Sequence, residues 1–432
     1  MVFSKTRILL LIGGVVIIAL IVFIFQFASK DDPGKVIGPP PEPIVVWGVF
    51  HEDPSLSGFD VGFPIQYKNF DIDVYEEALV SALAAGVGPD VYMIHNTWLP
   101  KFADKINPLN PGNVSILTIR DQFPFVVEQN FTAKDIVYAL PLYIDTLAMY
   151  YSKPLFEKSN IVFPPKTWEA LERDIPHLRR TDSSARITQA AATIGGSERT
   201  VNRMADIMSL LLLQNGVPIV DEGIGGARFA SKEGEEVFNY YLQFSDPKSE
   251  NYTWNDDFLF SIDAFAEDRA AITFNYSHLR ETLKKKQPFL RYEIRPMLQK
   301  EGGQETNYAN YWGMTVSRQS SKAATAWEYI KAMSINEGNA KRYVETYNRP
   351  PALLTLINQF INDPTWGVFA RQALTARSWF QIDNNIVEEA FSNVVRTVLI
   401  GRDRLPKVLG EAEGAINDAM RKRGTIIDSL FR

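Results

Sequence analysis

Residues 139–153 read ALPLYIDTLAMYYSK, and the fold prediction depends on this stretch more than on any other. Asp145 is the only charged residue between Asp135 and Lys153, and Pro141 interrupts the apolar run near its start. The pattern predicts an extended, mostly buried strand that tolerates a proline at its beginning. Asp145 then has two explanations: a capped or paired carboxylate of the core, or a carboxylate at a domain crossing that faces a cleft.

Length and composition predict a globular protein of several domains. With 432 residues the chain is too long for one ordinary core, so we expect two or three domains. The net charge of -6 gives no basic surface for nucleic acid. The sequence contains no cysteine, which excludes disulfides, thiol catalysis, cysteine-based zinc sites and a lipid anchor on cysteine.

The N-terminal segment has the composition of a membrane span. Residues 8–27 hold no charged side chain, and roughly 20 apolar residues cross a bilayer as a helix. Lys5 and Arg7 precede this segment, which favours an orientation with the N-terminus inside and the rest of the chain outside. A cleaved signal peptide is the alternative, but the apolar core is long for one and no good cleavage motif follows. We therefore predict a membrane anchor over residues 1–28 and a proline-rich linker over residues 29–43.

The first part of the exported chain has the spacing of an α/β sheet. Residues 44–50 and 91–94 are short apolar, β-branched runs that predict buried strands. Between them, Asp73 and Glu76 have the spacing of a capping box that opens a helix, and Gly86 ends this helix. Helix, turn and strand in this order indicate a parallel-sheet unit, so the predicted fold class is α/β.

Later segments predict further helices and one more strand. We expect a strand at residues 270–274 and helices at residues 232–244, 264–269, 323–333, 387–399 and 408–420. The residues expected to cap helices in this part of the chain are Thr167, Ser197, Ser277 and Ser334.

The sequence lacks the motifs that would indicate an enzyme or a cofactor. It has no GxSxG, HExxH or GxxxxGK[ST] motif, and its four histidines have no ligand spacing. We therefore predict no catalytic site, no metal and no cofactor. A glycosidase pair stays open, because 51 carboxylates make chance pairs inevitable.

Aromatic, amide and carboxylate side chains recur where the predicted strands end. Planar hydrogen-bonding groups suit hydroxyls, and flat rings stack on the C–H faces of sugars, so these residue types together indicate a neutral polyhydroxylated ligand. Core packing is the better explanation for any single aromatic residue, and only the recurrence at several strand ends argues for a site. The set comprises Trp47, Asn96, Trp98, Tyr143, Asp145, Trp254, Asn275, Tyr276, Tyr308, Asn310 and Trp312.

Three segments resemble, in their order and spacing, the extracellular solute-binding proteins of bacterial ABC importers, the maltose-binding-protein-like group (family 1). GPDVYMIHNTW at residues 88–98 looks like the family's strand and ligand loop. LPLYIDTLAMYY at residues 140–151, followed by PKTW at residues 165–168, looks like its first crossing between lobes. DRAAITFN at residues 268–275 is similar to the late strand that ends at the ligand, and the resemblance extends over residues 44–420.

The resemblance implies a two-lobed, periplasmic-binding-protein-like fold with the ligand in the cleft between the lobes. The first lobe would hold residues 44–140 and 314–375, and the second residues 145–310 and 379–432. The family's ligand-contact positions match Trp47, Asn96, Trp98, Tyr143, Asp145 and Asn275. Trp254, Tyr308 and Trp312 join the predicted site from composition. Family members in Gram-positive bacteria usually carry a lipid-attachment cysteine, so its absence here favours residues 8–27 as the tether.

The predicted function is that of a solute-binding receptor held at the extracellular side of the cell membrane. The receptor would bind a sugar or oligosaccharide and present it to the transmembrane subunits of an ABC permease, without enzymatic activity. Three alternatives stay open: an anchored hydrolase of surface glycans, a ligand-sensing subunit, and a polyamine binder that uses Asp145, Asp256 and Asp257.

Overall fold

The computed structural model describes residues 42–50, 59, 61–110, 112, 114–221, 225–424, 428 and 430. The predicted membrane segment, residues 1–28, and all but the last two residues of the predicted linker lie outside this range. Within the range, no helix combines the length and apolar character needed to cross a membrane. The compact unit from Pro43 to Arg432 is described below.

The apolar stretch at residues 139–153 contributes to three different sheets. It forms β6 (Leu140–Pro141), β7 (Asp145–Thr146) and β8 (Ala148–Ser152), so the prediction of one continuous strand was wrong. All residues from Ala139 to Ser152 are buried, as the pattern predicted. Pro141 lies in an edge strand, where its missing N–H removes no ladder hydrogen bond.

The first lobe is built on a mixed five-stranded sheet in the order β2-β1-β3-β14-β6. β1 pairs in parallel with β2 and with β3, which confirms the predicted parallel unit. β14 returns from late in the sequence and pairs antiparallel with β3 and β6. The strands new to this sheet are β1 (Ile44–Val49), β2 (Ile65–Phe70), β3 (Val91–His95) and β14 (Trp312–Val316).

The second lobe is built on another five-stranded sheet, in the order β12-β8-β11-β10-β9. β10 and β11 are parallel, and the remaining pairs are antiparallel. The predicted strand at residues 270–274 is confirmed as β11. The strands are β9 (Arg180–Thr181), β10 (Ile187–Ala192), β11 (Ala270–Asn275) and β12 (Tyr292–Pro296), together with β8.

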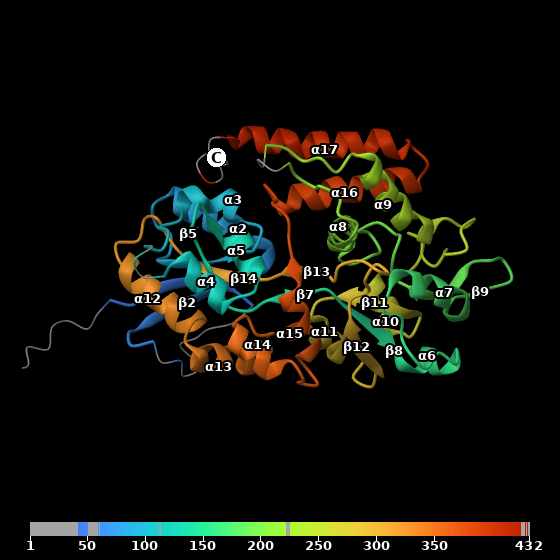
Figure 1. The fold of residues 1–432 in the computed structure, drawn as a ribbon, viewed down its shortest axis with the longest axis horizontal. Helices are drawn as coiled ribbons and strands as arrows, with labels where there is room; N and C mark the ends of the chain where they lie inside the picture. The colour runs from blue at the N-terminus through green and yellow to red at the C-terminus, as the bar shows by residue number, and fades with distance from the viewer. Residues whose placement is uncertain are drawn as a thin grey trace, which may run out of the picture. The chain divides into compact units, whose positions relative to one another are not determined.

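A three-stranded sheet joins the two lobes where the chain crosses between them. β13 (Asn307–Asn310) lies in its centre and pairs with β7 and with β15 (Ala376–Arg377). Each of these strands is followed or preceded by an element of the other lobe, so three crossings meet in one small ladder. Figure 1 shows β7 and β13 at the middle of the molecule, between the two groups of helices.

Helices cover both lobes. Those of the first lobe are α2 (Ile72–Ala84), α3 (Leu99–Phe102), α4 (Ile116–Gln122), α5 (Phe125–Phe131), α12 (Ala323–Ser334), α13 (Glu337–Tyr347), α14 (Leu354–Phe360) and α15 (Gly367–Leu374), with η2 (Ala103–Lys105) and the β4 (Thr132–Ala133) and β5 (Ile136–Val137) pair. Those of the second lobe are α6 (Lys153–Lys158), α7 (Trp168–Leu178), α8 (Met204–Gln214), α9 (Lys232–Leu242), α10 (Ser261–Ala266), α11 (Leu279–Lys286), α16 (Asn384–Leu399) and α17 (Leu405–Lys422), with η3 (Gln243–Ser245).

Helix starts were predicted less well than helix bodies. Thr167 caps α7 as expected, because its side chain accepts a hydrogen bond from the Ala170 N–H. The prediction for Ser197 was wrong, since α8 begins only at Met204. The prediction for Ser334 was also wrong: Asn336 caps α13, and Ser334 instead donates to the Pro141 carbonyl.

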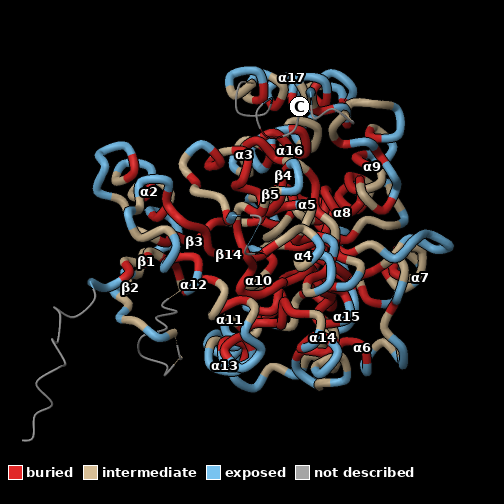
Figure 2. The backbone as a smooth tube through the Cα atoms, turned by 60° about the vertical axis from the view of Figure 1, so that its left-hand side comes forward, coloured by how far each residue is buried: buried red, intermediate tan, exposed pale blue. Residues whose placement is uncertain are grey.

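Each lobe has its own hydrophobic core. One core gathers residues around β1, β3 and β14, and the other surrounds β8, β10 and β11 and includes the inner faces of α16 and α17. Figure 2 shows buried residues along β3 and β14 and many exposed residues on α2 and α17. A smaller cluster, which includes Tyr150, Leu283 and Phe369, packs β8 and α11 against α15 and therefore supports the lobe junction.

Candidate functional site

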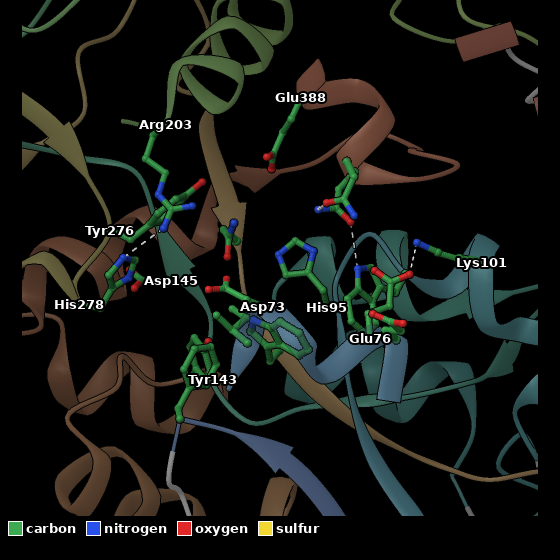
Figure 3. A pocket seen from close by; sticks show the side chains of 18 of the residues that line it. Asp73, Glu76, His95, Lys101, Tyr143, Asp145, Arg203, Tyr276, His278 and Glu388 are labelled. Carbon is green, nitrogen blue, oxygen red and sulfur yellow. Dashed lines mark hydrogen bonds and ion pairs between the residues drawn. The ribbon is translucent and has the colours of Figure 1, made fainter. Parts of the chain in front are cut away.

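A cavity of about 1050 Å³ opens between the lobes, and its walls come from both of them. Figure 3 shows Arg203, Tyr276 and His278 grouped on one side, with His95, Glu76 and Lys101 on the other. The first lobe contributes Phe50, Ile72, Asp73, Glu76, Glu77, Val80, His95, Trp98, Lys101, Trp312 and Arg349. Tyr143, Asp145 and Asn310 come from the crossings, and the second lobe contributes Arg203, Tyr276, His278, Asn384, Asn385, Glu388 and Arg423.

Two tryptophans form the apolar part of the first-lobe wall. Trp98 follows β3 and precedes α3, while Trp312 begins β14, and the pairing of β3 with β14 brings them together. Their ring centroids lie 5.0 Å apart at 69°. Phe50 meets Trp312 edge to face at 5.8 Å. Since Trp98 and Trp312 are only 6% and 5% exposed, each fills core volume and presents a small part of its ring to the cavity.

Asp145 lies in the cavity wall and is also fully hydrogen-bonded inside the protein. It accepts from the Ser277 N–H at 3.0 Å, the Ser277 hydroxyl at 2.6 Å and the Thr146 N–H at 2.9 Å. Burial raises its pKa to about 6, and the Ser277 hydrogen bonds oppose that rise. The structure therefore combines the two explanations offered for Asp145, a paired buried carboxylate and a position at the crossing.

Ser277 does not cap the helix that follows it, so that prediction was wrong. α11 has His278 at its N-cap with no side-chain capping bond, and the Ser277 hydroxyl donates to Asp145 instead. An unsatisfied buried carboxylate costs more free energy than an uncapped helix end, which explains why the Ser277 hydroxyl binds Asp145 and does not cap α11.

The two histidines of the cavity are neutral at physiological pH. Burial lowers the pKa of His95 to about 4, with a further lowering by Arg203 that the Asn310 hydrogen bond opposes. Enclosure in the cleft, with the charges of Arg203 and Arg349, lowers the pKa of His278 to about 3, although its ring is exposed to the cavity. Neutral imidazoles can donate and accept hydrogen bonds, which suits hydroxyl groups.

The acidic residues of α2 line the first-lobe wall instead of capping the helix. Asp71 occupies the N-cap position, so Asp73 lies inside the first turn and the predicted capping box was wrong. Asp73 and Glu76 therefore lie free of a capping role on the cavity side (Figure 3). The helix ends as predicted, since Gly86 after it has φ +73.

Direct contacts join the two lobes beside the cavity. Lys101 of α3 pairs with Glu76 and reaches Asp383, the N-cap of α16, at 2.7 Å. The Trp98 indole N–H donates to the Asn384 side chain at 3.0 Å. Arg423, just after α17, donates to the Lys101 carbonyl at 3.1 Å. These contacts close one side of the cleft.

Four of the nine predicted ligand residues line the cavity: Trp98, Tyr143, Asp145 and Trp312. Five do not: Trp47, Asn96, Trp254, Asn275 and Tyr308. Of the wider set from composition, Tyr276 and Asn310 also line it.

Each of the five other residues has partners within the protein. Asn96 donates to Asn130 and accepts from the Tyr311 N–H, while Asn275 donates to Asn202 and accepts from the Tyr276 N–H. Trp254 is fully buried and donates to Thr200, and the Tyr308 hydroxyl accepts from Gln381. Trp47 is half-buried and has the Lys68 ammonium 4.6 Å from its ring centroid. These amides and rings stabilise the strands that carry the cavity residues.

Arg203, Arg349 and Glu388 were missed by sequence reasoning. Arg203 is the N-cap of α8 and has a left-handed backbone at φ +66. Arginine is not a favoured N-cap residue, and the structure, not the sequence, shows that it occupies this position. Arg349 lies over Phe50 and Tyr143 in the connection after α13. Glu388 faces the cavity from α16, and enclosure, with repulsion from Asp206, raises its pKa to about 7.

The acidic cluster that suggested a polyamine ligand is not assembled. Asp256 accepts from the Ser197 N–H and the Thr200 hydroxyl, both at 2.8 Å, away from the cavity lining. Among the residues that the structure covers, no group of three or more histidine, aspartate or glutamate side chains could hold a metal ion.

Comparisons with known proteins agree with this architecture. The sugar-binding protein MalE of Xanthomonas citri aligns with a TM-score of 0.72 at 18% identity, covering 90% of this chain and 99% of that one. An ABC transporter solute-binding protein of Thermotoga lettingae, bound to α-D-tagatose, aligns with a TM-score of 0.68 at 21% identity, covering 88% and 100%.

Sequence matches are more local. A binding protein of Brucella abortus (strain 2308) is 28% identical over 165 residues, 36% of this chain and 38% of that protein. The maltotriose-binding protein of Pyrococcus abyssi is 31% identical over 99 residues, 22% of this chain and 20% of its own length. The chain thus matches well under half the length of these curated relatives.

The family assignment rests on a longer match. Residues 59–366 match the family model described as bacterial extracellular solute-binding protein, which is most of the chain. The structural neighbours share the two-lobed α/β arrangement at low sequence identity, so they support the fold assignment alone. The chain belongs to the bacterial extracellular solute-binding proteins, and it has their two-lobed, periplasmic-binding-protein-like fold.

Proposed function

We propose that the protein is a membrane-tethered extracellular receptor that binds a carbohydrate-like ligand between its lobes and presents it to the permease of an ABC importer. The observation that supports this best is the cavity of about 1050 Å³, which both lobes line. Residues 1–28 would be the tether. The lining set predicted from the sequence, Trp98, Tyr143, Asp145 and Trp312, would be part of the ligand site.

The chemistry of the cavity suits a ligand with many hydroxyl groups. Pockets for drug-sized ligands are roughly 300–1,000 Å³, so this cavity has room for an oligosaccharide. Phe50 offers ring surface for stacking beside the small exposed part of Trp312, and Asn310, Asn384 and His278 offer donors and acceptors. The relatives support this choice: structures of similar fold hold tagatose or maltotetraose, and one local sequence match is a maltotriose-binding protein.

Ligand binding would act by stabilising the closed arrangement of the lobes. The β7-β13-β15 sheet is the joint, and a ligand that contacts Trp312 and Tyr276 together contacts both lobes. Moving a population from mostly open to mostly closed requires a difference in binding free energy of roughly 5 kcal/mol between the two states. Several desolvated hydrogen bonds and one or two stacked rings supply that amount.

The alternative of a surface glycan hydrolase needs a carboxylate free to act on substrate. Asp145, the residue first considered for that role, is occupied by Ser277 and Thr146, which favours the receptor. A ligand-sensing subunit would use the same cavity and differ only in its membrane partner. Copurification of the full chain with a permease, as opposed to a kinase, separates those two.

The direct test is isothermal titration of the full chain with maltotriose, maltotetraose and other oligosaccharides. We expect saturable binding and no hydrolysis product. Phe50→Ala should weaken binding roughly threefold to tenfold, if a ring on the ligand is worth about as much as an aromatic pair, about 0.5–1.5 kcal/mol.

The matched control is Phe163→Ala, since Phe163 is 82% exposed in the connection after α6 and lies away from the cavity. It should bind as the wild type does. Silence across sugars and polyols would reject a carbohydrate ligand, and product release that Asp145→Asn abolishes would restore the hydrolase.

A further inference from the structure

The second-lobe wall contains a guanidinium that lacks a direct carboxylate partner. The Arg203 Nε is buried and has no hydrogen-bond acceptor. Its Nη2 donates to the His278 Nε2 at 3.3 Å, and the guanidinium carbon lies 5.3 Å from the Tyr276 ring centroid. Within the described part of the chain, no ion pair within 4 Å involves Arg203. A guanidinium enclosed in this way gains free energy from an acceptor that a ligand brings.

Arg203 is placed at the cavity at a cost to the helix that carries it. It lines both the main cavity and a neighbouring pocket of about 310 Å³. Arg203 is the N-cap of α8 at φ +66, and its side chain makes no capping hydrogen bond. Asn, Asp or Ser at this position could accept a hydrogen bond from the first turn of the helix. The side chain instead extends toward Tyr276 and His278, as Figure 3 shows.

None of the carboxylates near Arg203 that the structure describes forms an ion pair with it. The Asp145 oxygens accept from Ser277 and Thr146, and Asp206 accepts from the Tyr276 hydroxyl at 3.0 Å. Asp206 and Glu388 are close enough to feel the charge of Arg203, and repulsion from Asp206 adds to the enclosure that raises the pKa of Glu388 to about 7. Glu388 is therefore partly protonated at neutral pH and only partly offsets the guanidinium.

A second arginine adds positive charge at the same end of the cavity. Arg349 lies with its guanidinium carbon 4.9 Å from the Tyr143 ring centroid, on the first-lobe side. Both Arg203 and Arg349 lower the pKa of His278, which reports a positive field at that ring. Acidic side chains gather instead at α2, where Lys101 pairs with Glu76. The cavity is thus polarised, with its positive end at Arg203 and Arg349 and the neutral His278 between them.

We propose that the ligand is a carbohydrate that bears a carboxylate, a uronic acid residue, and that Arg203 binds this carboxylate. This inference rests on the proposed function and narrows its substrate class. A planar guanidinium matches a carboxylate with two parallel hydrogen bonds, and the unpartnered Nε is one of the donors such a pair uses. His278, neutral and exposed to the cavity, adds a polar contact beside it. The acidic end at α2 would accept from hydroxyl groups of the other rings.

The experiment titrates the full chain with matched sugars in which a carboxylate is replaced by a neutral group of similar size. One pair is the galacturonic acid trimer and its methyl ester, and the other is maltotriose and a glucuronate-terminated counterpart. We expect the acid of at least one pair to bind about tenfold tighter than its neutral partner, with an advantage that shrinks as salt rises.

Arg203→Asn removes the guanidinium while keeping the helix start. Asn tolerates the left-handed region and caps helices well, so folding is retained, which thermal unfolding checks. The Arg203→Asn protein should prefer the acid over the neutral sugar by less than about threefold. Arg203→Lys should keep part of the preference because it keeps the charge. The control Arg291→Gln removes a second-lobe surface arginine that pairs with Glu157, and it should leave the preference unchanged.

The outcomes separate this inference from the proposed function. Neutral sugars that bind as tightly as their acids would overturn the carboxylate proposal and leave a sugar receptor in place. Unchanged discrimination in Arg203→Asn would overturn the role of Arg203. Absence of binding to every sugar, charged or neutral, would instead reject the proposed function itself.

Discussion

The two walls of the cavity are held in different ways. In the first lobe, Trp98 and Trp312 are fixed by the pairing of β3 with β14 and are almost completely buried. In the second lobe, Arg203 and Glu388 project from helices and keep part of their surface in the cavity. Trp98 and Trp312 are therefore part of the hydrophobic core, while Arg203 and Glu388 are polar groups at the edge of the packed second lobe.

This difference predicts how substitutions divide between folding and binding. A buried aromatic side chain contributes to stability through the area it removes from water, whatever its contact with ligand. A half-exposed polar side chain at a helix start contributes little to stability and can be changed for specificity. Substitution of the buried tryptophans should therefore change mainly the stability of the fold, and substitution of Arg203 or Glu388 mainly the affinity for ligand.

The largest expected effect is on the first wall. Trp312→Ala should lower the free energy of unfolding by about 3–5 kcal/mol, because it leaves a cavity beside Trp98 and Phe50. Arg203→Asn, the matched change on the second wall, should alter it by less than about 0.5 kcal/mol. Urea unfolding followed by circular dichroism measures both. A Trp312→Ala protein within about 1 kcal/mol of the wild type would contradict the distinction between the walls.

The crossing between the walls should give the protein a pH-dependent stability. Burial raises the pKa of Asp145 to about 6, above its ordinary value of 3.8, so the folded protein holds a proton that the unfolded chain has released. Stability from this group is therefore complete below about pH 4 and is lost as the pH rises through about 6. Relative to Asp145→Asn, the wild type should lose about 3 kcal/mol over this range.

Unfolding free energies of the wild type and Asp145→Asn from pH 4 to pH 7.5 test this dependence. Parallel curves would show that Asp145 has an ordinary pKa and that the Ser277 hydrogen bonds cancel the effect of its burial. The expected result is a gap between the curves that changes only inside the predicted window.

The first wall and the crossing are the parts that the sequence predicted best. Trp98, Tyr143, Asp145 and Trp312 stand at strand ends, and strand ends can be read from apolar runs and their boundaries. Even there, the pattern gives the place and not the direction of a side chain. Asn275 ends β11 as expected but donates to Asn202, and Asn96 donates to Asn130 of α5, so both amides bond inside the protein and not to the cavity.

The second wall depends on packing that no local pattern contains. Arg203 and Glu388 lie 185 residues apart and meet only because α16 packs on α8. Asp73 and Glu76 had a convincing local explanation as a capping box, yet Asp71 took the N-cap position and left them on the cavity side. Where a local sequence pattern is compatible with two structures, the tertiary fold determines which of them forms.

The smallest expected effect lies at the seam where the walls touch. Lys101 and Asp383 form an ion pair across the lobes at 2.7 Å, with side chains that are 12% and 15% exposed. A double-mutant cycle of Lys101→Met and Asp383→Asn should give a coupling of about 0.5–1 kcal/mol, because the pair is enclosed but still touches water. Asp383→Asn is chosen since Asn also caps helices, and Asp383 caps α16. The control cycle uses Arg291 and Glu157, which are more than half exposed and should couple near zero. Equal coupling in both cycles would mean that the Lys101–Asp383 pair is an ordinary surface contact and adds no particular stability to the closed side of the cleft.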